Sequence, residues 1–211
     1  MRIVPSKTPK LVQKAFPQFI WDMPPEDRRV YLTFDDGPTP DVTEWVLDLL
    51  NAHRAKATFF CIGKNVEQHP DIFRRIRTEG HEVGNHTYSH LKGWNAQKED
   101  YISDTEKAAK FIPSRLFRPP YGKVSRGQAK GLTESGYQIV MWSLLSFDWD
   151  QTRNSDDCLN LVLPKLSAGD IVVFHDSVKA FPRLKYVLPR VLDYCMTKEY
   201  ELSALPTFQN D

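Results

Sequence analysis

Residues 29–38 read Arg-Val-Tyr-Leu-Thr-Phe-Asp-Asp-Gly-Pro, and this stretch decides how the rest of the chain is interpreted. Its first six residues are rich in β-branched and aromatic side chains, which is typical of a strand. Gly37 and Pro38 end that strand, so Asp35 and Asp36 are expected at its carboxyl end. Adjacent carboxylates repel each other, and a cation or a shared proton commonly relieves such a pair. A plain turn, with aspartates that cap the following helix, explains the same residues.

Composition limits the classes of function. The chain has 211 residues, which is enough for one large domain with a substantial core. Lysine and arginine number 28 against 27 aspartates and glutamates, so the net charge is +1. This balance predicts no strong attraction to nucleic acid or to an anionic membrane surface.

Cysteines and the N-terminus bear on the compartment. Cys61, Cys158 and Cys195 are odd in number and far apart, and we expect them to be reduced core residues. No apolar stretch approaches the length of a transmembrane helix. The first ten residues contain no apolar segment typical of a signal peptide. We therefore expect a cytoplasmic protein, with an exported form left open.

Strand-like and helix-like segments alternate along the chain. Strands are expected at 29–34, 57–62, 81–84, 116–117, 137–143 and 170–174, and a segment at 200–204 could close the sheet. Helices are expected from residue 40 or 41, from 70 to 80, at 97–112, 125–135 and 155–166, and finally over 184–195. The alternation predicts parallel βα units in an α/β fold. We expect one domain at 29–205, preceded by a proline-rich lead-in at 1–28 that lies across its surface.

Side chains able to do chemistry share one position in this pattern. Each follows the end of an expected strand, which is where α/β barrels and open α/β sheets build their sites. The residues are Asp35, Asp36, His86, His90, Arg118, Asp148 and His175.

His86 and His90 are candidates for a metal site. Their spacing would place both on one face of a helical turn. With a carboxylate from Asp36 they form a set that suits Zn²⁺ or a similar divalent cation. Three protein ligands leave a position open for water. Two unrelated surface histidines would explain the same spacing.

Three further residues are ambiguous when each is taken alone. His175 ends an apolar strand and is either a general acid or base or a partly buried core histidine. Asp148 is a candidate for a carboxylate that orients such a base. Arg118 is either a surface residue or a fixed guanidinium that keeps a carboxylate ionised.

Taken together, five short motifs resemble those of the polysaccharide deacetylases, carbohydrate esterase family four. They occur in the family's order and the resemblance spans about 29–205. The motifs are Thr33-Phe-Asp-Asp-Gly-Pro38, His86-Thr-Tyr-Ser-His90, Arg118-Pro-Pro-Tyr-Gly122, Asp148-Trp149 and Val172-Val-Phe-His175. This resemblance implies a distorted (β/α) barrel with fewer than eight regular strands.

The resemblance also implies a role for the first three motifs. Asp35 would be the catalytic base, held by Arg118. Asp36, His86 and His90 would bind a divalent metal, expected to be Zn²⁺ with Co²⁺, Mn²⁺ or Ni²⁺ as alternatives.

The remaining roles concern the substrate. The backbone N–H of Tyr121 would face the developing oxyanion. His175 would be the general acid, tuned by Asp148. Trp149 and Val173 would form an apolar slot for the acetyl methyl group.

The implied activity is metal-dependent removal of N-acetyl groups from an N-acetylated sugar oligomer or polymer, of the chitooligosaccharide or peptidoglycan type. An O-acetyl esterase acting on a xylan-like polysaccharide and a catalytically idle carbohydrate-binding protein are alternatives. A glycosidase that uses Asp35 and Asp36 is disfavoured, because that chemistry needs two carboxyl groups about 5–9 Å apart that flank the scissile bond. A carbohydrate is the expected partner, and the oligomeric state is left open.

Overall fold

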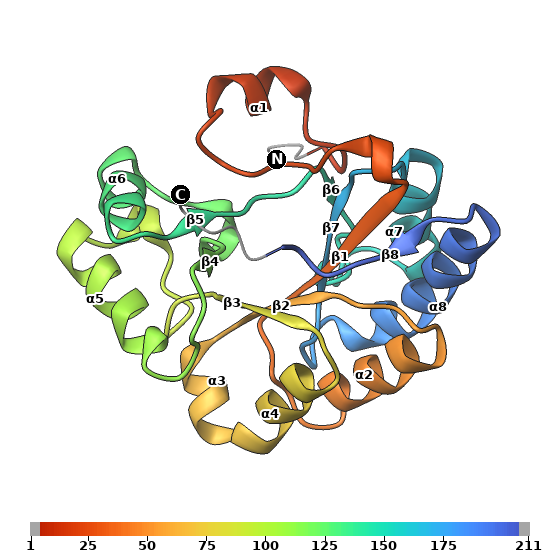
Figure 1. Cartoon of the computed structure of the whole chain (residues 1–211), viewed down its shortest axis with the longest axis horizontal. Coiled ribbons are helices and arrows are strands. Elements are labelled where there is room, and N and C mark those ends of the chain that lie inside the picture. Colours follow the sequence, from red (N-terminus) through yellow and green to blue (C-terminus); the bar gives the residue numbers. More distant parts are fainter. Residues whose placement is uncertain (1–4, 207–211) are drawn as a thin grey trace.

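Strand β1 (Arg29–Asp35) lies at the centre of the sheet in a computed structural model that describes residues 5–206. It pairs in parallel with β2 (Thr58–Cys61) on one side and with β7 (Ile171–His175) on the other. The path of the sheet is β5-β4-β3-β2-β1-β7-β6, and all neighbours on it are parallel. Figure 1 shows this sheet curled, with the helices around its outside. The predicted α/β fold, a distorted (β/α) barrel, is confirmed.

The other elements follow the predicted alternation closely. The remaining strands of the path are β3 (Glu82–Asn85), β4 (Leu116–Phe117), β5 (Gln138–Ile139) and β6 (Leu144–Leu145). The helices after β1 are α2 (Val42–Ala52), α3 (Gly63–Gln68), α4 (Pro70–Thr78), α5 (Lys98–Ala109), α6 (Arg126–Glu134), α7 (Ser155–Val162) and α8 (Phe181–Thr197). Cys61, Cys158 and Cys195 are free and buried, as predicted.

Alternation of side chains along β1 decides what faces the site. Val30, Leu32 and Phe34 are fully buried in the main apolar core, which α2 and α8 also line. The intervening residues Thr33 and Asp35 point to the opposite, inner face of the curled sheet, because successive strand side chains alternate. Side chains on both faces of β1 are buried. The sequence of the strand is therefore an almost continuous apolar run that ends in a carboxylate.

The single strand predicted at 137–143 is wrong in its extent. Ladder pairing stops after β5 and resumes only at β6. Between them, the carbonyls of Val140 and Met141 accept hydrogen bonds from the Arg118 guanidinium, at 3.3 and 2.9 Å. The buried Arg118 side chain thus binds carbonyl groups that would pair with a neighbouring strand in a regular ladder. Strands β5 and β6 form the two ends of the sheet path, and the chain between them closes the barrel.

Two smaller expectations are also corrected, and helix α3 (Gly63–Gln68) is an addition to the predicted elements. The segment at 200–204 forms β8 (Glu201–Leu202), which pairs beside the start of β1 and does not close the barrel. Helix α3 was not predicted, since its six residues carry no side-chain cap. The helix expected at 155–166 ends as α7 at Val162, and a 3₁₀ turn at Leu163–Lys165 contains Pro164, whose missing N–H disfavours α-helix.

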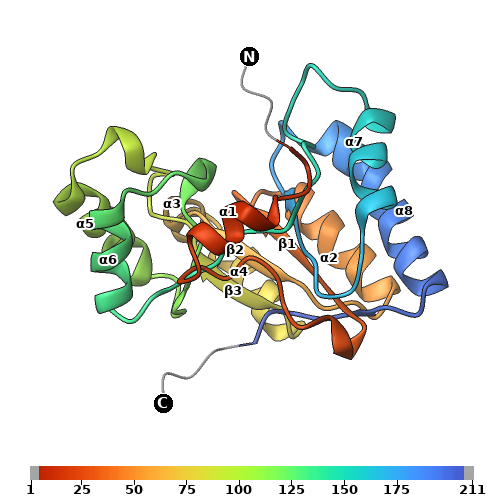
Figure 2. The ribbon, with the colours of Figure 1, turned by 90° about the horizontal axis from the view of Figure 1, so that it is seen from above.

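Residues 5–28, the described part of the predicted lead-in, pack on the irregular closing segment; residues 1–4 lie outside the described residues. Helix α1 (Lys10–Ala15) lies between the α6 side and the α7 side of the molecule (Figures 1 and 2). Main-chain hydrogen bonds join Thr8 N to Ser143 O at 2.8 Å and Met141 N to Ile20 O at 2.7 Å. The lead-in therefore satisfies backbone groups that the interrupted ladder leaves open. Within residues 5–206, no helix has both the length and the apolar character needed to cross a membrane.

Trp21→Ala should lower the free energy of unfolding by about 3–5 kcal/mol, because a buried indole is lost. Trp21 is 9% exposed, packs with the cluster that contains Tyr101 and Phe117, and donates from Nε1 to Phe16 O at 3.0 Å. Trp94→Ala is a matched control: that ring is 56% exposed and the change should cost about 0.5 kcal/mol or less. Urea denaturation measures both. Equally small losses would show that the lead-in does not pack on the barrel in solution.

Candidate active site and metal centre

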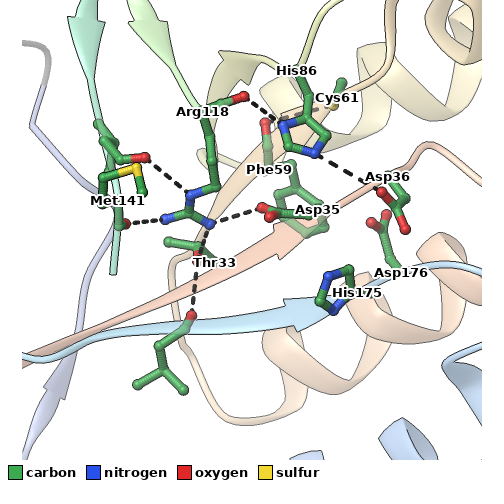
Figure 3. Close-up of polar contacts among 12 residues, drawn as sticks. Thr33, Asp35, Asp36, Phe59, Cys61, His86, Arg118, Met141, His175 and Asp176 are labelled. Carbon is green, nitrogen blue, oxygen red and sulfur yellow. Dashed lines mark hydrogen bonds and ion pairs between the residues drawn. The ribbon is translucent and has the colours of Figure 1, made fainter. Parts of the chain in front are cut away.

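The predicted site residues come together at the carboxyl ends of the strands. Asp35 and Asp36 end β1, His86 and His90 follow β3, Arg118 and Tyr121 follow β4, Asp148 and Trp149 follow β6, and Val173 and His175 belong to β7. Because parallel strands end at the same rim, residues far apart in the chain become neighbours. Figure 3 shows the Asp35, Asp36, His86, Arg118 and His175 side chains around this rim.

Asp35 forms a buried ion pair with Arg118. The Arg118 Nη1 donates to Asp35 Oδ1 at 2.8 Å and to Thr33 Oγ1 at 2.6 Å. Arg118 is fully buried and Asp35 is 4% exposed. Burial alone would raise the pKa of Asp35, but the Arg118 guanidinium, together with His86 and His175, outweighs burial and holds the pKa below its usual value. Asp35 is therefore an ionised carboxylate at neutral pH. The next residue, Asp36, is partly exposed to solvent.

His86 and His90 face Asp36, and all three are available as ligands. The Nε2 atoms of His90 and His86 lie 3.3 and 4.0 Å from Asp36 Oδ1. His86 Nδ1 lies 2.7 Å from the carbonyl oxygen of Arg118. Since a carbonyl only accepts, Nδ1 carries the proton and Nε2 keeps its lone pair. Burial lowers the pKa of His86 to about 4 and lowers the pKa of His90, so both rings are neutral at pH 7.

These distances fit a small divalent cation. The ligand atoms of Asp36, His86 and His90 all lie within 4.8 Å of one another. Bonds of about 2.0–2.1 Å in a tetrahedral site place neighbouring donors about 3.3 Å apart, close to the His90–Asp36 distance. The side chains of Asp36 and His90 are 23% and 25% exposed, so one side of the set is open to solvent. Two imidazoles and one carboxylate suit Zn²⁺ and similar first-row metals.

The predicted helical turn that would join His86 to His90 is wrong. Residues 86–90 form a loop in which Thr87 and His90 have positive φ angles of 62° and 57°. Asn85 fixes the start of this loop, because its Oδ1 accepts from Thr87 N at 2.8 Å. Asp104 holds the middle by accepting from Tyr88 N at 3.0 Å. The two imidazoles meet, with centroids 5.1 Å apart, through loop geometry and not through helical periodicity.

His175 is paired with Asp148. Its Nδ1 lies 2.8 Å from Asp148 Oδ1, and its backbone N–H donates to Asp148 Oδ2 at 2.8 Å. Burial would lower the pKa of His175, but the Asp148 carboxylate, together with Asp36 and Asp35, outweighs burial and raises the pKa to about 9. The imidazolium is therefore the form expected at neutral pH. With Nδ1 on Asp148, Nε2–H is the proton that can be given to a bound molecule.

Tyr121, Trp149 and Val173 border the charged groups. Tyr121 has a φ of 59°, is 60% exposed, and its ring centroid is 4.7 Å from that of His90. No acceptor for its backbone N–H is found within residues 5–206. Val173 is buried beside Leu145 in an apolar cluster against which Trp149 packs, and the Trp149 ring is 6.4 Å from the His175 ring. The rim thus combines an open donor with an apolar wall.

Some residues of the site carried no clear signal in the sequence. Thr33 and Asn65 orient site groups: Thr33 Oγ1 accepts from Arg118, and Asn65 Nδ2 donates to the Asp36 carbonyl at 2.8 Å. Asn65 lies on α3, the helix that was not predicted. Asp176 is fully buried directly after His175, and that adjacency is the one signal that could have found it.

Comparisons with known proteins agree with this geometry. A family model described as polysaccharide deacetylase matches residues 22–140. A peptidoglycan-N-acetylglucosamine deacetylase from Bacillus cereus is 38% identical over 167 residues, covering 74% of this chain and 76% of the relative. A chitooligosaccharide deacetylase from Azorhizobium caulinodans is 36% identical over 154 residues, covering 70% of this chain and 73% of the relative.

Similarity extends to a solved structure. The crystal structure of the Bc1960 peptidoglycan N-acetylglucosamine deacetylase, in complex with a naphthalenyl N-oxidanyl-benzamide, superposes with a TM-score of 0.82. It is 33% identical, with 92% of this chain and 94% of that chain covered. Some peptidoglycan deacetylase relatives are longer: the chain spans 56% of a second one from B. cereus and 33% of one from Listeria monocytogenes.

Arg118→Met should destabilise the protein by about 3–5 kcal/mol at pH 7, because it leaves the Asp35 carboxylate buried without a counter-charge. In the variant, burial raises the pKa of Asp35 above its unfolded value. Protonation on folding then recovers stability as the pH falls, so the deficit should be largest at pH 7 and smaller at pH 5. Denaturant unfolding at both pH values measures this. Arg115→Met, a change at an exposed arginine, should cost little and show no such pH trend; a deficit at Arg118 that does not change with pH would contradict the assignment.

Proposed function

The chain belongs to the polysaccharide deacetylase family, and we propose that it removes N-acetyl groups from an N-acetylated glycan of the peptidoglycan or chitooligosaccharide type. One observation carries this proposal. An ionised carboxylate, Asp35, and a protonated imidazole, His175, are held around the Asp36, His86 and His90 donor set. Amide hydrolysis needs a base for water and an acid for the amine, and this rim offers both.

Asp36, His86 and His90 would hold the metal ion. We propose Zn²⁺, with Co²⁺, Mn²⁺ or Ni²⁺ as alternatives, because two neutral imidazoles and one carboxylate suit these ions. When bound, the ion supplies Lewis acidity toward the acetyl carbonyl and lowers the pKa of a coordinated water.

Asp35 would act as the base. Its carboxylate takes a proton from the water as the water oxygen adds to the acetyl carbon. Arg118 keeps Asp35 ionised and holds it through the 2.8 Å ion pair, so the base is in the correct state before substrate arrives. A buried carboxylate without this partner would take up a proton more readily and would lose its basic form.

Tyr121 and His175 would handle the charges that develop on the substrate. The free N–H of Tyr121 would donate to the tetrahedral oxyanion, a contribution of about 10²–10³ in rate. His175 Nε2–H would protonate the amine nitrogen as the C–N bond breaks, a contribution of about 10²–10⁴. Asp148 stabilises the imidazolium before transfer and fixes the ring. Acetate and a free amine are the products, with the acetyl methyl directed toward Trp149 and Val173.

Product analysis tests this function. The protein with added Zn²⁺ is incubated separately with chitooligosaccharides, peptidoglycan fragments and acetylated xylan, and the products are identified by mass. Loss of acetyl groups from the N-acetylated substrates, with chain length kept, would support the proposal. Shortened chains would indicate a glycosidase, acetate from xylan alone an esterase, and binding without any product an idle carbohydrate-binding protein.

Asp35→Asn and Asp36→Asn should fail in different ways. Asp36→Asn should weaken metal binding, and excess Zn²⁺ should restore part of the activity, because a ligand is lost and the base remains. Asp35→Asn should keep bound metal yet stay inactive at any metal concentration, since an amide cannot accept the proton. Elemental analysis of metal content and turnover against added Zn²⁺ distinguish the two. The reverse pattern would exchange the two assignments.

His175→Ala should lower turnover on N-acetyl substrates by about 10²-fold or more and leave metal content near normal. An aryl acetate should suffer much less, because its leaving group needs little protonation. Parallel kinetics on the amide and the aryl ester, with metal analysis of the same preparation, measure the difference. Equal losses on both substrates would argue against a general-acid role.

A further inference from the structure

Asp176 is a buried carboxyl group that the mechanism above does not use. It follows His175 at the end of β7 and is fully buried. Figure 3 shows its side chain reaching toward the turn that carries Asp36. A carboxyl group without solvent requires hydrogen-bond partners, and those of Asp176 belong to this turn and to the helix after it.

Both oxygens of Asp176 are used. Its Oδ1 accepts from the Gly37 N–H at 2.9 Å, and its Oδ2 accepts from the Thr43 hydroxyl at 2.5 Å. Thr43 Oγ1 in turn accepts from Thr39 N at 2.7 Å. The main-chain N–H of Asp176 donates to the Asp35 carbonyl at 3.1 Å. The residue that follows β7 therefore holds the chain on both sides of Asp36.

The fit between Asp176 and Gly37 is close. A Cβ atom added to Gly37 would lie 1.9 Å from Asp176 Oδ2, so only glycine can occupy this position while the carboxyl group is in place. The glycine of the Asp-Asp-Gly-Pro stretch thus has a packing reason in addition to ending the strand.

Asp36 needs this support because its backbone is strained. Its φ is 86°, a region that side chains other than glycine rarely adopt and that costs about 1–3 kcal/mol. A plausible metal site keeps its ligand distances within about 0.2 Å of the usual values. If the turn relaxed, the Asp36 carboxylate would move away from its 3.3 Å approach to His90. Asn65 supports the Asp36 carbonyl, but Gly37 N and Thr39 N depend on Asp176 and Thr43.

We propose that Asp176 is a positioning residue that holds the turn at residues 36–39, so that Asp36 faces His86 and His90. It acts through its hydrogen bonds to Gly37 and Thr43 and touches neither substrate nor metal. The inference rests on the metal site of the proposed function. It adds an outer support to that site, which comes from the residue directly after β7, the strand that ends in His175.

Four variants test this role by Zn²⁺ affinity, measured in competition with a chromophoric chelator and without substrate. Asp176→Ala should raise the dissociation constant at least tenfold. Asp176→Asn should raise it less than threefold, because the amide oxygen can accept from Gly37 and the amide nitrogen can donate to Thr43 Oγ1. Thr43→Val should fall between them, since it breaks the link to Thr39.

Asp170→Ala is the matched control. Asp170 is also a buried aspartate next to β7, 3% exposed, but it precedes the strand and bonds to Lys7, Ser143 and Ser167. Its loss should lower the melting temperature of the metal-free protein and leave Zn²⁺ affinity within twofold. At saturating Zn²⁺, Asp176→Ala should recover most of the kcat on a chitooligosaccharide, because alanine keeps the main-chain N–H that binds the Asp35 carbonyl.

Several results would overturn the inference. Unchanged Zn²⁺ affinity in both Asp176→Ala and Thr43→Val, or an equal loss in Asp170→Ala, would make Asp176 merely structural. If Asp176→Ala does not fold, Asp176→Asn and Thr43→Val decide: retained affinity in the first and loss in the second support the role, and any other pair contradicts it. An Asp176→Asn variant as weak as Asp176→Ala would show that charge, not hydrogen bonding, is required. Failure of the unaltered protein to bind Zn²⁺ would overturn the metal site itself.

Discussion

The fully buried guanidinium of Arg118 is the constraint on which the site and the closure of the barrel both depend. A guanidinium has five N–H donors and cannot be deprotonated in a protein, so burying it requires acceptors on every side. Four donors are used: one each to Asp35, Thr33, Val140 O and Met141 O. The first two lie on β1 and the last two on the closing segment. Arg118 therefore joins β4 to the centre of the sheet and to the irregular segment that closes it.

This constraint separates two chemically identical neighbours. Asp35 points inward from β1 to Arg118, and its pKa is held below the usual value although burial would raise it. Asp36 comes one residue later, where the positive φ turns the chain and brings its partly exposed carboxylate to His90. A buried carboxylate paired with a guanidinium and a partly exposed carboxylate that faces two imidazoles thus come from consecutive residues, because the strand ends between them. The Arg118 guanidinium lowers the repulsion expected from two adjacent carboxylates by pairing with Asp35.

Much of the fold could be predicted because its signals are local. The apolar runs of β1 and β7 and the periodic helices α2 and α8 depend on burial patterns that the residues themselves display. The extent of the 137–143 strand could not be predicted, since the partner that interrupts it is a side chain about twenty residues away in the chain, Arg118. Helix α3 is too short and uncapped to give a signal.

The candidate site, like the fold, has features that could be predicted from the sequence and features that could not. Its members could be found from their places after strand ends and from five motifs in order, and the structure brings them together. The loop that connects His86 to His90 could not be predicted. Thr87 and His90 have positive φ there, and only a glycine would have indicated such a conformation in the sequence.

Five of the nine non-glycine residues with positive φ in the described chain lie in the loops of the rim: Asp36, Thr87, His90, Tyr121 and Phe147. Such conformations persist only where the surroundings over-determine them. Apolar packing is non-directional and cannot hold a particular dihedral angle, whereas a hydrogen bond to a named backbone group can. Buried polar residues such as Asn85, which binds Thr87 N, are therefore the expected means of keeping these loops in place, and they lie beneath the site because the strain is there.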